Sequence, residues 1–440
     1  MKKLYGAQTE KALANFPFHF RKTPKEFIRA IVEIKKAGAI AHGKAGELDA
    51  GRKTAIVKAC DEILKGEHAE QFVLPAFQGG AGTSNHTNVN EVIANRATEI
   101  LKASGSKNVV HPNDHVNMSH STNDVMPSAL KITAYRIAEK LLATFDVVAE
   151  SFDAKAREFK DVVKLGRTHL QDAVPVTLGS EFAAYAECVR RGARRVKTAS
   201  HDLLELNLGG TAVGNAINSS AQYRKQLFVE LKEITGLKVV PAKNLMAQTS
   251  SNTDFVWLSQ SLVAVCVDLS KISNDLRLLS SGPRGGLGEL YIPELQAGSA
   301  IMPGKVNPVL METVNQLYFL VSGNNLSIEH SAEASQLELG VMLPLVADRL
   351  IESLSLMDEV LLQFAKKCVD GITANKGRCR ELLEKSTAYA TRLTPKIGYD
   401  ATAELVKESV AGGKTIRELA LEKKLLTNEE FDALVKGFRP

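Results

Sequence analysis

The chain has few cysteines and no long apolar run. Its five cysteines are scattered along the sequence: Cys60, Cys188, Cys266, Cys368 and Cys379. Their odd number and the lack of CxxC spacing predict free thiols in a reducing compartment, not a disulfide framework. No apolar stretch approaches 18 residues, so we expect no membrane span.

A strong excess of one charge is also missing. The chain carries 55 Lys and Arg against 50 Asp and Glu, a net charge of +5, with the two signs well mixed. No run of Lys and Arg interleaved with aromatics occurs, so we expect no nucleic-acid partner. Residues 1–3 begin like a secretory signal, but the sequence YGAQ follows at 5–8 where a long apolar run is needed. We therefore expect a cytoplasmic protein.

Several common catalytic motifs are absent. The segment 412–415 resembles the end of a phosphate loop, but Glu408 stands where that motif needs its first glycine. No Gly-x-Ser-x-Gly elbow of a hydrolase occurs. His111 and His115 have metal-like spacing, but Pro112 argues against a helix there and no third ligand is evident. We expect no metal and no cofactor.

Helical periodicity dominates the rest of the chain. Apolar residues recur at steps of three or four across 255–280, which predicts a helix buried in a bundle. We expect a mainly α protein that also contains other long helices, several shorter helices and two short strands. Long helices are predicted at 127–160 (with Pro127 at its first position), 177–206, 309–330 and 335–368. Shorter ones are predicted at 378–390, 400–410, 415–423 and 427–437, and strands at 162–165 and 237–240.

The segment 298–308, with the sequence GSAIMPGKVNP, is a shaped loop. Its glycines and prolines favour neither helix nor strand. It presents Ser299, Lys305 and Asn307 within nine residues, a set that suits a small anion whose charge grows during a reaction. A surface turn would need neither Lys305 nor Asn307.

Three other polar loops, at 79–85, 119–124 and 166–172, favour a shared site for a substrate with two carboxylates. Hydroxyl and amide donors can fill the lone pairs of one carboxylate, and Lys305 with Asn307 can hold the other. His169 adds a group that titrates near neutral pH. Helix capping is the alternative for residues 121–124 taken alone. Ser299 could act as a base toward carbon if positive charge or N–H groups lower its pKa.

These segments resemble the aspartase/fumarase superfamily. Besides the 298–308 loop, the resemblance covers nearly the whole chain in the family's order: QGGAGTSN (78–85), NVNEVIANRA (88–97), NDHVNMSHSTND (113–124), GRTHLQD (166–172), LNLGGTAVG (206–214), NDLRLLSSGPRGGLGE (274–289) and DGITAN (370–375). It implies a mainly α, three-domain subunit, with domains at 1–117, 118–368 and 369–440. The central helices would form a homotetramer whose active sites are each shared among three subunits.

The resemblance also implies roles for individual residues. Ser299 matches the base that removes a carbon-bound proton, and Lys305 and Asn307 match the binders of the carboxylate that becomes an aci-carboxylate. Glu312 matches the carboxylate that pairs with His169. The remaining matches are substrate-binding residues: Thr83, Ser121, Thr122, Asn123 and Thr168.

Within the family we expect elimination of ammonia from L-aspartate to give fumarate, because the 78–83 and 121–124 segments resemble that branch. Hydration of fumarate is the alternative, as are a lyase for another amino or hydroxy dicarboxylate and a non-catalytic structural homologue. Three departures from the family pattern surround the expected pocket. Ala300 replaces a common serine, His86 a common Asn, and His120 a common Gln.

Overall fold

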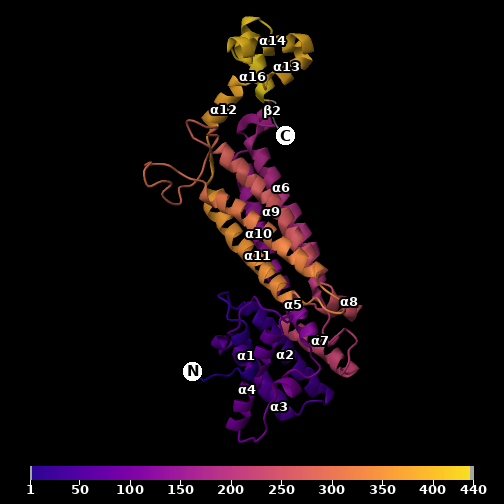
Figure 1. Cartoon of the computed structure of the whole chain (residues 1–440). Coiled ribbons are helices and arrows are strands. Elements are labelled where there is room, and N and C mark those ends of the chain that lie inside the picture. The colour runs from indigo at the N-terminus through magenta and orange to yellow at the C-terminus, as the bar shows by residue number, and fades with distance from the viewer. Residues whose placement is uncertain (1, 437–440) are drawn as a thin grey trace. The chain divides into compact units, whose positions relative to one another are not determined.

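The computed structural model describes residues 2–436, and it is predominantly helical with three two-stranded sheets among those residues (Figure 1). The chain divides into two compact units. Unit 1 contains the residues up to Leu142, Arg194–Ala264 and Phe319–Met357. Unit 2 contains Ala143–Ala193, Val265–Tyr318 and the residues from Asp358 onward.

Unit 1 contains the N-terminal helices, packed around α2. Its elements are α1 (Ala7–Asn15), α2 (Lys25–Ala45), α3 (Ala50–Leu64), η1 (Ala69–Gln71), α4 (Thr83–Ala103), η2 (Pro112–Val116), η3 (Asp202–Leu204), β3 (Glu205–Leu206), α7 (Ala221–Thr235), β4 (Val240–Pro241) and α8 (Leu245–Ser250). Helix α2 packs against α3 and α7, and its residues Ile31, Val32 and Ile34 are fully buried. Only β4 remains of the strand predicted at 237–240.

Five long helices have residues in both units: α5 (Thr122–Glu158), α6 (Leu178–His201), α9 (Thr253–Leu279), α10 (Val309–Glu333) and α11 (Leu343–Gln363). In unit 1, Asn324 of α10 donates to Glu352 of α11. In unit 2, Asn315 of α10 donates to the Ser270 carbonyl of α9, and Thr144 of α5 donates to Asp358. These contacts confirm the predicted bundle of long helices.

Unit 2 also holds a β-hairpin and the C-terminal helices. Its elements are β1 (Val163–Thr168), β2 (Gln171–Thr177), β5 (Leu290–Tyr291), η4 (Phe364–Cys368), η5 (Val369–Gly371), β6 (Thr373–Ala374), α12 (Lys376–Lys385), α13 (Ala390–Ile397), α14 (Tyr399–Gly412), α15 (Ile416–Glu422) and α16 (Asn428–Lys436). Leu393, Leu405, Ile416 and Phe431 pack with Leu165 of β1 in one apolar cluster. Helix α13, which contains Pro395, was not predicted.

Two predicted helix starts are wrong. Helix α5 begins at Thr122, five residues before Pro127, which therefore lies inside the helix. The carbonyl of Asn123 lacks its usual donor because proline has no N–H, and the Nδ2 of Asn207 donates to it instead, at 3.0 Å. Helix α11 begins at Leu343 and not at 335, with Pro344 in its first turn.

One described helix is long and apolar enough to cross a membrane by length and composition alone. It is α9, in which 56% of the most apolar window is buried inside the chain. A core helix of a bundle has the same properties, and the contacts of α9 with α10 identify it as one.

Candidate active site

The Ser299 hydroxyl lies in the turn that begins the 298–308 loop of unit 2. Its Oγ accepts hydrogen bonds from the backbone N–H groups of Ile301 and Met302, each at 3.2 Å. Two N–H groups aimed at one oxygen stabilise negative charge on it. The predicted role of Ser299 as a base stays a prediction, and these two N–H groups are the kind of donor that it requires.

The same loop is closed on itself at its two ends. The Nδ2 of Asn307 donates to the Gly298 carbonyl at 2.8 Å, which leaves the second N–H of this amide for another partner. A Cβ built on Gly298 would lie 2.0 Å from the Lys305 carbonyl oxygen, so only glycine fits there. The loop thus brings the Ser299 and Lys305 segments together, with the Lys305 side chain exposed.

Thr168 and His169 lie at the tip of the hairpin formed by β1 and β2. Thr168 pairs with Gln171, so His169 and Leu170 form a two-residue turn with φ of 56° and 61°. Such turns normally use Asn or Gly, because positive φ is unfavourable for other residues. The turn holds the His169 side chain exposed, and a strained backbone at an exposed histidine is typical of a functional site.

The base of this hairpin is fixed by buried charges. Arg167 donates to the fully buried Glu289 at 2.9 Å, and Lys164 lies 3.4 Å from the same carboxylate. Lys164 also pairs with Glu181 at 2.9 Å. Removing one of these charged side chains would leave the remaining buried charges unpaired, which is strongly destabilising. The intact group therefore holds the base of the hairpin in place.

Glu312 lies in the first turn of α10 and is exposed. Its carboxylate accepts from Gln316 at 3.2 Å. Within the part of the chain that the structure describes, no ion pair joins Glu312 to His169. The pairing that the resemblance implies stays a prediction, and it would have to form between subunits or on substrate binding.

In unit 1, the polar residues of the 79–85 and 119–124 loops begin helices α4 and α5. Thr83 is the exposed first residue of α4. Ser121 directly precedes α5, and Thr122 is its first residue. The Nδ2 of Asn123 donates to the Ala212 carbonyl at 2.7 Å. Thr122 and Asn123 line a small pocket, the "α5 pocket", with Ala81, Pro127, Thr249, Asn252, Leu339, Gly340 and Leu343.

A buried carboxylate supports the start of α5. Asp124 accepts the N–H of Ser121 at 2.9 Å through Oδ1, and those of Gly209 and Thr211 at 3.0 and 3.1 Å through Oδ2. Burial raises its pKa to about 6, against the opposing effect of these N–H groups and of Lys35. Asp124 thus connects the 206–214 segment to the 119–124 loop.

A second buried polar group lies behind the 119–124 loop. Lys35 is fully buried in α2, and its Nζ contacts the Asn117 Oδ1 at 2.6 Å and the His120 Nδ1 at 3.3 Å. Burial lowers the pKa of Lys35 to about 7. The hydroxyl of Tyr223 lies 2.8 Å from the other ring nitrogen of His120. Lys35, Asp124 and Tyr223 are not among the residues that the sequence motifs predict for the site. A lysine among the apolar positions of 27–39 was the available signal.

His42 also belongs to the buried part of α2, although a histidine beside Lys44 and Glu47 is more often found at the surface. It stacks on Tyr223 with ring centroids 3.8 Å apart. Its Nδ1 contacts Glu47 at 2.6 Å and its Nε2 the Met118 carbonyl at 3.0 Å. One partner is therefore close in the sequence and the other is the backbone of a distant loop, so both ring nitrogens are paired inside the fold.

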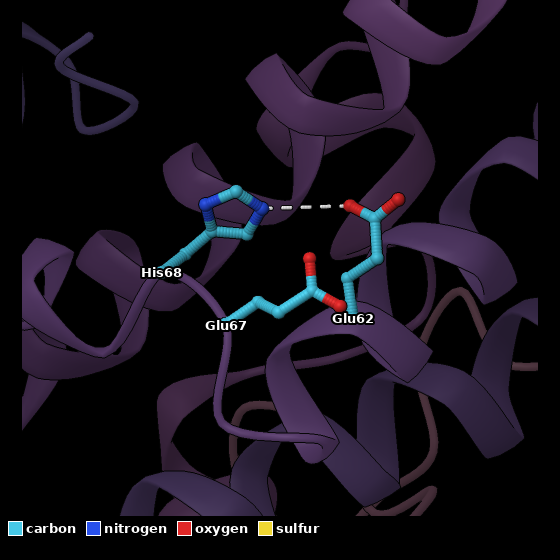
Figure 2. Close-up of side chains that lie close together, drawn as sticks. All are labelled: Glu62, Glu67 and His68. Atoms are coloured by element: carbon cyan, nitrogen blue, oxygen red, sulfur yellow. Dashed lines mark hydrogen bonds and ion pairs between the residues drawn. The ribbon is translucent and has the colours of Figure 1, made fainter. Parts of the chain in front are cut away.

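One group of three potential metal ligands occurs among the described residues: Glu62, Glu67 and His68 (Figure 2). Figure 2 shows the His68 ring facing Glu62, at 3.4 Å, with Glu67 beside them. Arg96 already binds both oxygens of Glu62, at 2.5 and 3.0 Å, and lowers the pKa of that carboxyl. The guanidinium supplies the positive charge that a metal would otherwise bring.

The expected site residues therefore fall into two sets. Unit 1 holds Thr83, Ser121, Thr122 and Asn123, and unit 2 holds Thr168, His169, Ser299, Lys305, Asn307 and Glu312. Hydroxyl and amide donors dominate the first set, and the second contains the groups that can move a proton or carry charge.

Comparison with known proteins identifies the family. A family model described as "Lyase" matches residues 1–323, and one described as "Fumarase C C-terminus" matches 390–438. Aspartate ammonia-lyases from Bacillus subtilis and Escherichia coli are 44% and 42% identical to the chain. The match covers 99% and 97% of this chain, and 92% and 90% of theirs.

Solved structures agree in fold. A fumarate lyase:delta crystallin from Brucella melitensis bound to cobalt has a TM-score of 0.95 at 43% identity, over 100% of this chain and 96% of that one. A class II fumarase from Schistosoma mansoni has a TM-score of 0.94 at 36% identity, over 99% and 95%. The chain therefore belongs to the aspartase/fumarase superfamily, and it is a carbon–nitrogen lyase.

Proposed function

We propose that the protein removes ammonia from L-aspartate to give fumarate, reversibly and without a cofactor. The observation that carries this proposal is the Ser299 hydroxyl held by two backbone N–H groups in the loop that also contains Lys305. The names and high identity of the relatives support aspartate as the substrate.

In the proposed reaction the deprotonated Oγ of Ser299 takes a proton from C3 of aspartate and becomes a hydroxyl, which loses this proton to solvent before the next turnover. The electron pair of that C–H bond moves into the neighbouring carboxylate, which becomes a doubly charged aci-carboxylate. Lys305 and the free N–H of Asn307 stabilise this charge, because fixed donors act where charge develops. The electron pair then forms the C2–C3 double bond as the C2–N bond breaks, and ammonia leaves.

The other set of residues binds the second carboxylate. Thr83, Ser121, Thr122 and Asn123 offer hydroxyl and amide donors at the starts of α4 and α5, where the helix dipoles also favour an anion. Thr168 and His169 lie near the leaving group, and Glu312 holds the tautomer and charge of His169.

We also propose that the site forms in a homotetramer, from loops of three subunits. Apolar side chains on two bundle helices are exposed in the single chain: Trp257, Val267 and Leu278 on α9, and Phe319, Leu320 and Leu326 on α10. Phe319 and Leu326 are 65% and 53% exposed and lie two turns apart on one face. Such a face is typical of a helix that another subunit covers. The three-domain division and the cytoplasmic location stay predictions.

The substrate is tested by incubating the purified protein with L-aspartate and following the ultraviolet absorbance of fumarate. We expect fumarate from aspartate and little malate from fumarate. Hydration of fumarate with no reaction of aspartate would support the second candidate, fumarate hydratase, which the 36% identity to a class II fumarase favours. Activity only with a substituted aspartate would assign a related lyase.

The role of Ser299 is tested by Ser299→Ala. We expect kcat to fall by about 100- to 10,000-fold, because a general base typically contributes that factor. The fold should stay intact, since Ser299 lies in an exposed loop. Ser104→Ala, which removes an exposed hydroxyl at the end of α4, is the matched control. A Ser299→Ala enzyme with near wild-type turnover would exclude Ser299 as the base.

A further inference from the structure

His86 connects the starts of the two helices that carry the proposed carboxylate-binding residues. It follows Thr83 by three residues in the first turn of α4 and is only 2% exposed. Its Nδ1 lies 3.0 Å from the Oγ1 of Thr122, the first residue of α5. This hydrogen bond is the side-chain contact that links the two polar loops of unit 1.

The second ring nitrogen of His86 is buried and has no hydrogen-bond partner among the described residues. Burial lowers the pKa of His86 well below its usual value, and the charge of Lys35 lowers it further. The ring is therefore neutral at physiological pH, and one nitrogen carries a proton while the other does not.

The unpartnered Nε2 decides between the two tautomers. If Nε2 carried the proton, a buried N–H would have no acceptor, which is the more costly kind of unsatisfied group. With the proton on Nδ1, the ring donates to the Thr122 oxygen and the bare Nε2 leaves only an acceptor unsatisfied. The tautomer that is protonated at Nδ1 is therefore favoured.

The tautomer fixes what the Thr122 hydroxyl can do. When His86 donates to it, the hydroxyl hydrogen is not used in that bond and can be donated elsewhere. Thr122 lines the α5 pocket with Asn123, so the pocket is where that hydrogen can find an acceptor. A carboxylate accepts hydrogen bonds only, which makes the direction of this hydroxyl important.

We propose that His86 is a positioning residue for substrate binding: its Nδ1–H donates to Thr122 and so directs the Thr122 hydroxyl toward a substrate carboxylate. The inference deepens the proposed function and rests on it. It also gives a role to a residue at which this chain departs from the family pattern.

The test compares His86→Leu with His86→Asn. Leucine removes the donor, whereas the Asn Nδ2 stands at the same distance along the side chain as the His Nδ1 and can still donate. We expect KM for L-aspartate to rise about five- to tenfold in His86→Leu, the loss of roughly one neutral hydrogen bond, with little change in kcat. His86→Asn should restore most of the affinity. His19→Leu, a change at an exposed histidine, should leave KM unaltered.

A double-mutant cycle separates positioning from general packing. Thr122→Val should raise KM by itself, and adding His86→Leu should then raise it no further. If the factors by which the two single substitutions raise KM multiply in the double variant, the proposal is wrong. An unchanged KM in a His86→Leu enzyme would also overturn it.

The tautomer is measured without any turnover. Solid-state ¹⁵N NMR of histidine-labelled protein should show a neutral ring protonated at Nδ1 whose signals vanish in His86→Asn. An Nε2-protonated ring would overturn the inference. If the wild-type protein leaves aspartate unchanged, the proposed function fails, and this spectrum still decides whether His86 donates to Thr122.

Discussion

Gly298 offers a test of how closely the catalytic loop must be packed. In Gly298→Ala the new Cβ would lie 2.0 Å from the Lys305 carbonyl oxygen, whereas ordinary contacts begin near 3.4 Å. The loop segments that contain Gly298 and Lys305 must therefore move apart by about 1.4 Å. That movement shifts Ser299 relative to Lys305 and breaks the bond from Asn307 to the Gly298 carbonyl. A misplacement of about 1 Å costs roughly 100-fold in rate, so we expect kcat to fall by about that factor.

The assay is steady-state kinetics with L-aspartate, together with the thermal midpoint of the same samples. The midpoint should change little, because the loop is exposed and contributes little to the core. Gly285→Ala is the matched control, since a Cβ there meets no atom within 4 Å and the loop that contains it is also exposed. A Gly298→Ala enzyme with kcat close to the wild-type value would show that Ser299 and Lys305 need no fixed separation.

Two further predictions concern assembly and pH. If each site takes loops from several subunits, dissociating and mixing inactive Ser299→Ala and Asn123→Ala proteins should restore measurable fumarate formation, and no recovery would mean that each site belongs to one subunit. Asp124 has its pKa raised from 3.8 to about 6, so the folded chain holds this proton more tightly than the unfolded chain. Its contribution to stability is therefore present at acidic pH and falls by about 3 kcal/mol as pH rises from about 4 to 6. Asp124→Asn should lose this pH-dependent part of the stability. Denaturation midpoints of the wild-type and variant proteins, compared across this pH range, measure the loss. Midpoints that change equally with pH in the two proteins would refute the prediction.

The long helices were predictable because their side chains repeat the helical period. The range 255–280 differs from α9 by two residues at its start and one at its end. The start of α5 was not predictable, since Pro127 leaves the Asn123 carbonyl without its helical donor and Asn207, 84 residues after Asn123, supplies the missing one. Local rules describe a proline and its neighbours, and they carry no information on distant side chains.

The candidate site was predictable to the extent that loops and exposed groups define it. The glycines and prolines of 298–308 predicted a shaped loop, and the structure adds that its N–H groups are directed at Ser299. The supporting residues were not predictable. Lys35 and Asp124 have a role only because they are buried against other polar groups, and a sequence does not show which polar residues are buried together.

The three departures from the family pattern differ in what they can do to specificity. His86 is buried and contacts Thr122, while His120 contacts Lys35 and Tyr223, so an effect of either on specificity would pass through other side chains. Ala300 differs from them because it is exposed and directly follows Ser299. In the proposed reaction, the hydroxyl that is missing at this position would be a donor near the reacting carboxylate. A preference for a substrate larger or less polar than aspartate at that end would therefore originate at Ala300, and Ala300→Ser should shift it back toward aspartate.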